Sequence, residues 1–198
     1  MNLKNTLHKL ETGEPVKIVA LGDSLTYGWM VDKGFLDYLK EMLAVKYPGS
    51  LITIINRGIP GDTAEGGLHR LEHHVLKSEP DLVFIQFALN DAFSGYPVER
   101  FRSNIESIIG KIINETSSEL LLMTSGALEE NEQWIAEKFY STLQQIAEKE
   151  EMQIVCVHEY WERKMGEGTA FDTLVQADRV HPTTAGYRLM AEAVMEVL

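Results

Sequence analysis

Five short apolar segments, separated by longer segments of helical period, restrict the possible folds of this chain most strongly. They are residues 16–21, 51–55, 82–89, 120–124 and 154–158, and each consists mainly of apolar residues. A strand that is apolar without alternation is typical of a sheet that is covered on both faces. These segments therefore predict five strands of one buried sheet.

Apolar residues between these segments recur every three or four positions, as they do along one face of an α-helix. They predict five helices, marked by Leu36/Leu39/Leu43, Leu68/Leu71/Val75, Phe101/Ile105/Ile108/Ile112, Ile135/Phe139/Leu143/Ile146 and Tyr187/Met190/Ala191/Val194/Leu198. Alternation of strands and helices predicts right-handed crossovers, and so an α/β fold with a parallel sheet and helices on both faces. Residues 159–177 show no clear period and predict a long loop, a kind of segment that often carries function.

Length and composition limit the class of protein. The 198 residues, with 44% hydrophobic and 24% charged, predict a single globular domain over residues 1–198. The formal net charge of −12 disfavours nucleic acids and stable membrane association, because both surfaces are themselves negatively charged. A single cysteine, Cys156, excludes an intrachain disulfide. Residues 1–16 do not have the continuous apolar stretch of a secretory signal, which favours a cytoplasmic location.

Polar residues follow the predicted strands at the points where a ligand would bind. In open parallel sheets, ligands occupy the crevice beyond the carboxyl ends of the strands, where the strand order reverses. The residues at these positions are Gly22-Asp23-Ser24 after the first strand, residues 56–61 after the second, Asn90-Asp91 after the third, and Asp178 and His181 further along after the fifth. We expect these residues to converge on one site.

Ser24, His181 and Asp178 are the residue types that nucleophilic catalysis requires. A serine hydroxyl is a weak nucleophile until an imidazole accepts its proton, and a carboxylate must hold that imidazole in the right tautomer. Asp178 and His181 are three positions apart, so a local turn would let the carboxylate accept the Nδ1 proton and leave Nε2 facing Ser24. Pro182 and Thr183 suit the start of the last helix.

Acyl transfer also requires hydrogen-bond donors that face the developing oxyanion. Three candidates are the backbone N–H of Ser24, the backbone N–H of Gly61 and the side-chain amide of Asn90. Gly61 can approach a ligand closely because it has no Cβ.

Four sequence blocks in this order resemble those of the GDSL/SGNH hydrolase family. They are Gly22-Asp23-Ser24-Leu25, Gly61, Ala88-Leu89-Asn90-Asp91 and Asp178-Arg179-Val180-His181. The resemblance implies a three-layer, flavodoxin-like α/β/α sandwich and no cofactor or metal. It also implies Ser24 as nucleophile, His181 as base, Asp178 as the orienting acid, and Ser24, Gly61 and Asn90 as oxyanion donors. Ala88 departs from the glycine that many members have, which puts the local backbone approach in question.

Each block taken alone also has a structural explanation, because Ser24 and Asp178 suit helix caps, and Asn90 and Asp91 suit a turn. His69, His73 and His74 have a spacing that a metal site could use, but they flank the apolar face of their helix, which favours solvent exposure. Asp23 and several aromatic residues are candidates for substrate binding, and for the aromatic residues ordinary packing is an equal alternative: Trp29, Phe93, Tyr96 and Trp161.

The blocks together predict a serine hydrolase that cleaves a small-molecule carboxylic ester through an acyl-enzyme on Ser24. Lysophospholipids, short-chain esters and thioesters all fit as substrates. Three alternatives are an acyltransferase or a carbohydrate deacetylase with the same residues, and a non-catalytic flavodoxin-like binding protein. An acid at position 23, where a phosphate-binding loop would lie, disfavours the last.

Overall fold

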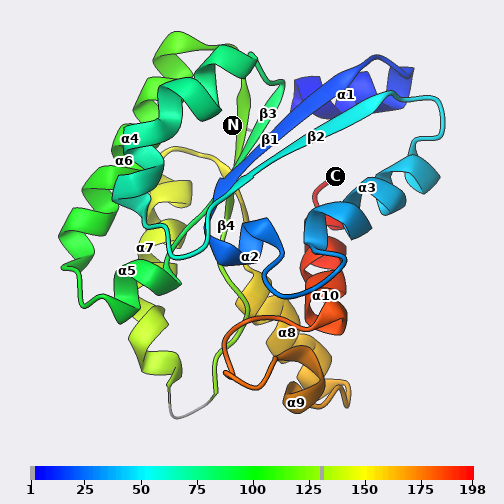
Figure 1. Cartoon of the computed structure of the whole chain (residues 1–198). Coiled ribbons are helices and arrows are strands. Elements are labelled where there is room, and N and C mark those ends of the chain that lie inside the picture. The colour runs from blue at the N-terminus through cyan, green and yellow to red at the C-terminus, as the bar shows by residue number, and fades with distance from the viewer. Residues whose placement is uncertain (1–2, 130–131) are drawn as a thin grey trace.

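A computed structural model describes residues 3–129 and 132–198, in which five parallel strands form one sheet in the order β2-β1-β3-β4-β5 (Figure 1). The strands are β1 (Val16–Gly22), β2 (Ile52–Gly58), β3 (Leu82–Gln86), β4 (Glu119–Met123) and β5 (Gln153–Val155). This strand order is that of flavodoxin-like sheets, and it reverses between β1 and β3. The predicted α/β class and parallel sheet are confirmed.

Helices cover both faces of the sheet (Figure 1). On one side lie α4 (Ala64–His74), α6 (Val98–Glu115) and α7 (Gln133–Lys149), and on the other lie α3 (Phe35–Lys46), α8 (Val157–Gly166) and α10 (Thr184–Met195). The predicted apolar stripes face the sheet: in α6, for example, Phe101, Ile105, Ile108 and Ile112 are all completely buried. Full burial of one such side chain contributes about 1.5–3 kcal/mol. The five predicted helices and the three-layer arrangement are confirmed.

Short helices occupy the end of the sheet to which the strands run (Figure 1). They are α2 (Ser24–Tyr27) after β1, α5 (Leu89–Phe93) after β3, and α9 (Phe171–Leu174) before α10; the one-turn 3-10 helix η1 (Leu76–Ser78) follows α4. Three expectations for this end are wrong. The fifth strand ends at Val155 rather than at residue 158, because α8 begins at Val157. The third strand ends at Gln86 rather than at residue 89, because the chain turns there into α5.

Residues 159–177 are also not a long loop, since they contain most of α8 and all of α9. Within α8, Val157, His158 and Trp161 are buried at helical spacing. Glycines at 166 and 168 and the run of charged residues obscured that short apolar pattern.

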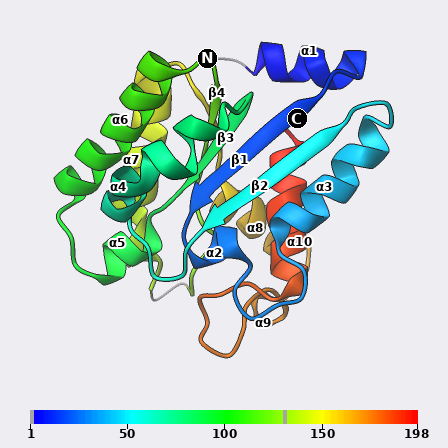
Figure 2. The same ribbon diagram turned by 45° about the horizontal axis from the view of Figure 1, so that its top comes forward.

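At the opposite end of the sheet lies α1 (Lys4–Thr12), which the sequence reasoning did not predict (Figure 2). The Glu119 carboxylate accepts hydrogen bonds from the backbone N–H groups of Asn5 (2.9 Å) and Thr6 (2.8 Å), which caps the helix. Lys9 forms an ion pair with Asp81 (2.6 Å), and the same carboxylate accepts from the N–H of Lys17 (2.7 Å). Across the described residues, no helix is both long and apolar enough to span a bilayer.

Candidate active site

Ser24 lies at the point where the strand order reverses. It is the first residue of α2, directly beyond the carboxyl end of β1, and its side chain is almost fully buried. Asp23 precedes it as the helix N-cap, and its Oδ1 accepts from the N–H of Leu25 (2.9 Å). The chain turns this tightly because Gly22 has no Cβ: one built there would lie 2.1 Å from Thr26 Oγ1.

A chain of hydrogen bonds links Asp178, His181 and Ser24. His181 Nδ1 donates to Asp178 Oδ2 (2.7 Å), which leaves Nε2 to accept from Ser24 Oγ (2.9 Å). Asp178 Oδ1 accepts from the N–H groups of Val180 (3.0 Å) and His181 (2.9 Å). Partial burial raises the pKa of Asp178, but these N–H donors and the imidazole outweigh it, so the pKa lies below its usual range. Such a geometry allows a histidine to remove a hydroxyl proton while a carboxylate stabilises the imidazolium.

Loop contacts hold this histidine segment against α2 and α9. Gln176 donates its backbone N–H to His181 O (2.8 Å) and its side-chain amide to Trp29 O (2.9 Å). Arg179 has a left-handed backbone (φ 65°), and its guanidinium binds Glu129 (2.7 Å from Nε) and Asp172 (2.6 Å). These contacts fix the backbone that carries Asp178 and His181. The helix start predicted at Thr183 is confirmed, since the Thr183 hydroxyl accepts from the N–H of Gly186.

Asn90, in α5, is bonded to the loop that contains Gly61. Asn90 Nδ2 donates to the carbonyl of Asp62 (2.8 Å), the residue after Gly61, and Gly61 itself has a left-handed φ of 78°. Asp91 is fully buried and accepts from the N–H of Ala64 (3.1 Å), which caps α4. Asn90 and Asp91 thus hold the loop at residues 59–63 by bonds at Asp62 and at Ala64.

Ala88 fits its position without strain. Its φ of 172° is an extended conformation that any residue adopts, and its side chain is completely buried. Replacement of glycine by alanine therefore leaves this block intact.

Buried acids lie directly beneath the site. Asp23 is almost completely inaccessible, and its Oδ2 has no hydrogen-bond partner among the described residues. Burial raises its pKa to about 7, and the nearby charges of Asp91 and Asp62 add to this. Burial likewise raises the pKa of Asp91 to about 6. Asp23 is therefore largely protonated below neutral pH.

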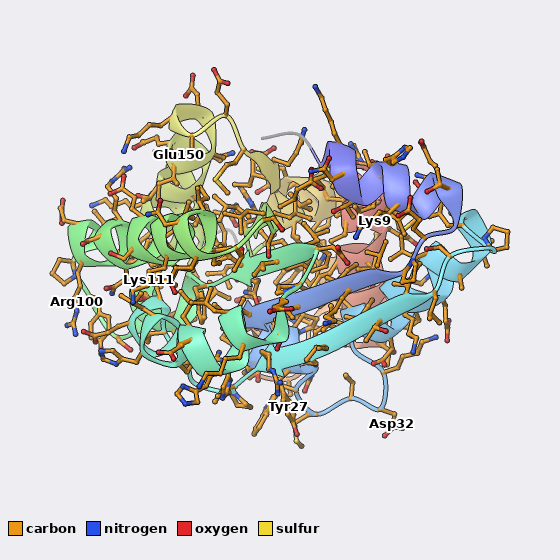
Figure 3. The ribbon with its side chains drawn as sticks, turned by 90° about the horizontal axis from the view of Figure 1, so that it is seen from above. Lys9, Tyr27, Asp32, Arg100, Lys111 and Glu150 are labelled. Carbon is orange, nitrogen blue, oxygen red and sulfur yellow. The ribbon has the colours of Figure 1, made fainter. Side chains whose placement is uncertain are left out.

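A small cleft of about 200 Å³ opens above Ser24. Its lining combines the polar groups just described with apolar side chains: Asp23, Ser24, Leu25, Leu89, Asn90, Phe93, Asp178, Val180 and His181. Phe93 and Asp23, two of the predicted substrate-binding residues, thus reach the cleft. Trp29 is one-third exposed and its ring centroid lies 6.0 Å from that of His181. Figure 3 shows Tyr27, at the end of α2, at the edge of the molecule near the exposed Asp32.

Two other aromatic residues are not part of the cleft. Trp161 is completely buried and packs against Gly126 and Gly186, so the prediction that it lines the crevice is wrong. It belongs to the inner face of α8, whose residues were expected to form a loop. Tyr96 does not line the cleft either; its ring packs under the guanidinium of Arg100, 4.3 Å away.

The sequence reasoning missed two polar groups that support the site. Tyr187, counted there only as part of an apolar helix face, is completely buried, and its hydroxyl accepts from the N–H of Trp29 (3.0 Å). Burial raises the pKa of this phenol, so it stays neutral. Arg70 is the second. The sequence pattern that could have indicated it is Gly66, Arg70 and His74 at intervals of four, which places the arginine on one helix face between a glycine and a histidine.

The remaining histidines have protein partners or face solvent. His74 Nδ1 accepts from Arg70 (3.1 Å), while His69 and His73 are exposed. His158 is buried, bonds to Thr124 Oγ1 through Nδ1 (2.8 Å), and its pKa is lowered by burial. Within the described ranges no group of three or more His, Cys, Asp or Glu side chains is placed to hold a metal ion.

The sequence matches the GDSL-like lipase/acylhydrolase family over residues 20–189. The chain belongs to this family. Ester hydrolysis by a serine hydrolase is therefore its class of activity, and the alternative of a non-catalytic flavodoxin-like binding protein is not supported.

Curated relatives of this GDSL-like chain include esterases. An arylesterase of Vibrio mimicus is 29% identical over 141 residues, which cover 70% of this chain and 69% of the relative. An acetylxylan esterase of Geobacillus stearothermophilus is 26% identical and 94% of each chain is covered. The crystal structure of that acetylxylan esterase has the same fold, with a TM-score of 0.80, 24% identity, and 91% of this chain and 93% of the other covered.

Proposed function

We propose that Ser24 attacks the carbonyl carbon of an ester while His181 Nε2 accepts the hydroxyl proton. The imidazolium then donates this proton to the leaving alkoxide, which departs as an alcohol and leaves an acyl-enzyme on Ser24. Water attacks the acyl-enzyme, His181 takes its proton, and the proton returns to Ser24 as the acid is released. The observation that carries the proposal is the hydrogen-bond chain from Asp178 through His181 to Ser24, with lengths of 2.7 and 2.9 Å.

Donors for the oxyanion come from the segments that follow three strands in this proposal. They are the N–H of Ser24 at the start of α2, the N–H of Gly61 and the side-chain amide of Asn90 in α5. The bond from Asn90 to Asp62 supports this assignment, because it ties the loop of Gly61 to α5. One such donor contributes about 3 kcal/mol to transition-state stabilisation.

The size of the cleft favours a small acyl group. About 200 Å³ is below the roughly 300 Å³ at which pockets for drug-sized ligands begin. The leaving group must lie on the side of His181, which protonates it, and there the exposed face of Trp29 is available for a flat ring. Aryl acetates combine a small acyl group with a flat ring, and acetylated sugars combine it with a puckered ring whose C–H face can stack on an indole, which agrees with the arylesterase and the acetylxylan esterase among the relatives.

The test is hydrolysis of p-nitrophenyl acetate, butyrate and octanoate by the wild-type chain and by Ser24→Ala. We expect turnover of the acetate and butyrate, much less of the octanoate, and a loss of at least about a thousandfold in Ser24→Ala, since the acyl-enzyme cannot form. Phe93→Ala is the control for the cleft: it should extend turnover toward the octanoate while labelling of Ser24 by a fluorophosphonate persists. Equal inactivity of the wild type and Ser24→Ala toward all three esters would contradict the proposal.

A further inference from the structure

Arg70 lies beneath the loop that contains Gly61, and its side chain is only 13% exposed. It projects from α4 toward the carboxyl ends of β1 and β2. Its guanidinium makes hydrogen bonds to three different segments: Gly22 O (2.9 Å from Nη2), Arg57 O (2.7 Å from Nη1) and Asp62 Oδ2 (2.7 Å from Nε). A planar guanidinium with five donors can hold several acceptors in fixed directions, which a lysine ammonium cannot do.

Two of these acceptors lie within two positions of a proposed oxyanion donor. Gly22 is two positions before Ser24, and Asp62 directly follows Gly61. Asp62 is in turn the residue whose carbonyl accepts from Asn90. One side chain therefore connects the segments that carry all three donors.

Charge strengthens this connection. The Arg70–Asp62 ion pair is mostly shielded, with both side chains 13% exposed, so it is screened little by solvent. His74 Nδ1 accepts from Nη1 on the other side and so completes the shell around the guanidinium.

We propose that Arg70 is a positioning residue for the esterase reaction, which sets the Gly61 N–H relative to Ser24 through Asp62 and Gly22. It does not touch the substrate, and the inference rests on the proposed function. Because the oxyanion develops only after attack, a misplaced Gly61 N–H weakens binding of the transition state more than binding of the ester. The effect of Arg70 is thus on kcat rather than on KM.

The experiment compares Arg70→Met, Arg70→Lys and Asp62→Ala with the wild type on p-nitrophenyl acetate. Each kcat is divided by the concentration of sites that a fluorophosphonate titrates, so a loss of folded protein does not count as a loss of rate. We expect kcat per site to fall about 30-fold in Arg70→Met and about fivefold in Arg70→Lys, with KM within threefold of the wild type. The matched control is Arg188→Met, which replaces an exposed arginine on α10 that forms an ion pair with Glu192 (3.1 Å); its kcat per site should not change.

A double variant tests the route through Asp62. If Arg70 acts by holding that residue, Arg70→Met combined with Asp62→Ala should be no slower than the slower single variant. Multiplicative losses in the double variant, or a kcat per site within twofold of the wild type in Arg70→Met, would overturn the inference.

If Arg70→Met does not fold, Arg70→Lys and Asp62→Ala decide the question by the same twofold criterion. An inert wild-type chain would instead overturn the proposed function itself, so the two failures are distinguishable.

Discussion

The two halves of the candidate site are built in different ways. The serine half, formed by the loops after β1, β2 and β3, is held from within: Asp23 and Asp91 are buried, and Arg70 lies among backbone carbonyls. The histidine half lies at the surface, where the side chain of Asp178 is 47% exposed and that of Arg179 is 36% exposed.

The two halves should therefore respond differently to salt and to substitution. Buried hydrogen bonds and shielded charges respond little to salt but strongly to a single substitution, because the remaining partner is left unsatisfied. Exposed ion pairs contribute little individually and weaken as the salt concentration rises. Substitutions in the two halves should therefore differ in size and in salt dependence.

The largest effect is expected for Asp178→Asn, which removes the acceptor of the hydrogen bond from His181 Nδ1 in the histidine half. The amide oxygen can keep the bonds from the N–H groups of Val180 and His181, so the NH₂ group then faces Nδ1. His181 must accept there, its proton moves to Nε2, and Nε2 can no longer accept from Ser24. We expect kcat to fall roughly a hundred- to a thousandfold with little change in KM.

Steady-state kinetics on p-nitrophenyl acetate measure this effect, with Asp172→Asn as a control that removes a nearby exposed carboxylate. A tenfold loss or less in Asp178→Asn would mean that the tautomer of His181 does not depend on Asp178.

An intermediate effect is expected for Asp23→Asn, on stability rather than on rate. The folded-state pKa of Asp23 is about 7, and an unfolded aspartate titrates near about 3.9. Between these values the folded chain holds the extra proton, so the free energy of unfolding must fall as the pH rises. The amide cannot ionise and still accepts from Leu25 N–H, so the variant should lose this slope.

Urea denaturation between pH 4 and pH 8 measures the slope. Relative to the wild type, Asp23→Asn should gain stability as the pH rises from about 4 to about 7, by a total on the order of 4 kcal/mol. Asp91 titrates in the same window in both proteins, so the difference between them reports mainly on Asp23. Asp32→Asn, which changes an exposed side chain at the edge of the molecule (Figure 3), should not alter the slope. A parallel pH dependence in Asp23→Asn and the wild type would contradict the buried protonated acid.

The smallest effect is expected for Arg179→Met. Loss of the exposed ion pairs to Glu129 and Asp172 should lower kcat/KM by about two- to fivefold at low salt. Added sodium chloride should reduce the wild-type activity toward that of the variant, because it screens the same pairs. Arg163→Met, which removes an exposed pair with Glu196, provides the control. A loss of a hundredfold, independent of salt, would show that the two halves are not built differently.

Periodicity was sufficient to predict the sheet and the long helices, because the three central strands are buried on both faces and each long helix carries one apolar stripe. It was insufficient for α8, whose inner face has only Val157, His158 and Trp161, and for α1, which depends on the distant Glu119. Contacts between residues more than a hundred positions apart leave no local pattern in the sequence.

The same distinction applies to the site. Ser24, Asn90, Asp178 and His181 could be predicted because they follow strands or share a turn, and the structure brings them to one cleft. Trp161 could not be placed correctly, because an aromatic residue near a predicted crevice packs as readily into the core. The partners of Arg70 could not be predicted either, since two of them are backbone carbonyls that any sequence would supply.

The position of α1 places contacts that stabilise the fold far from the residues of the candidate active site. Its cap on Glu119 and its ion pair to Asp81 stabilise the end of the sheet farthest from the cleft (Figure 2). Free-energy changes at such distant sites are generally additive. The amino ends of the strands are therefore the region in which a protein engineer can accumulate thermostabilising substitutions, separately from changes around Trp29 and Phe93, the side chains that we propose to contact the substrate.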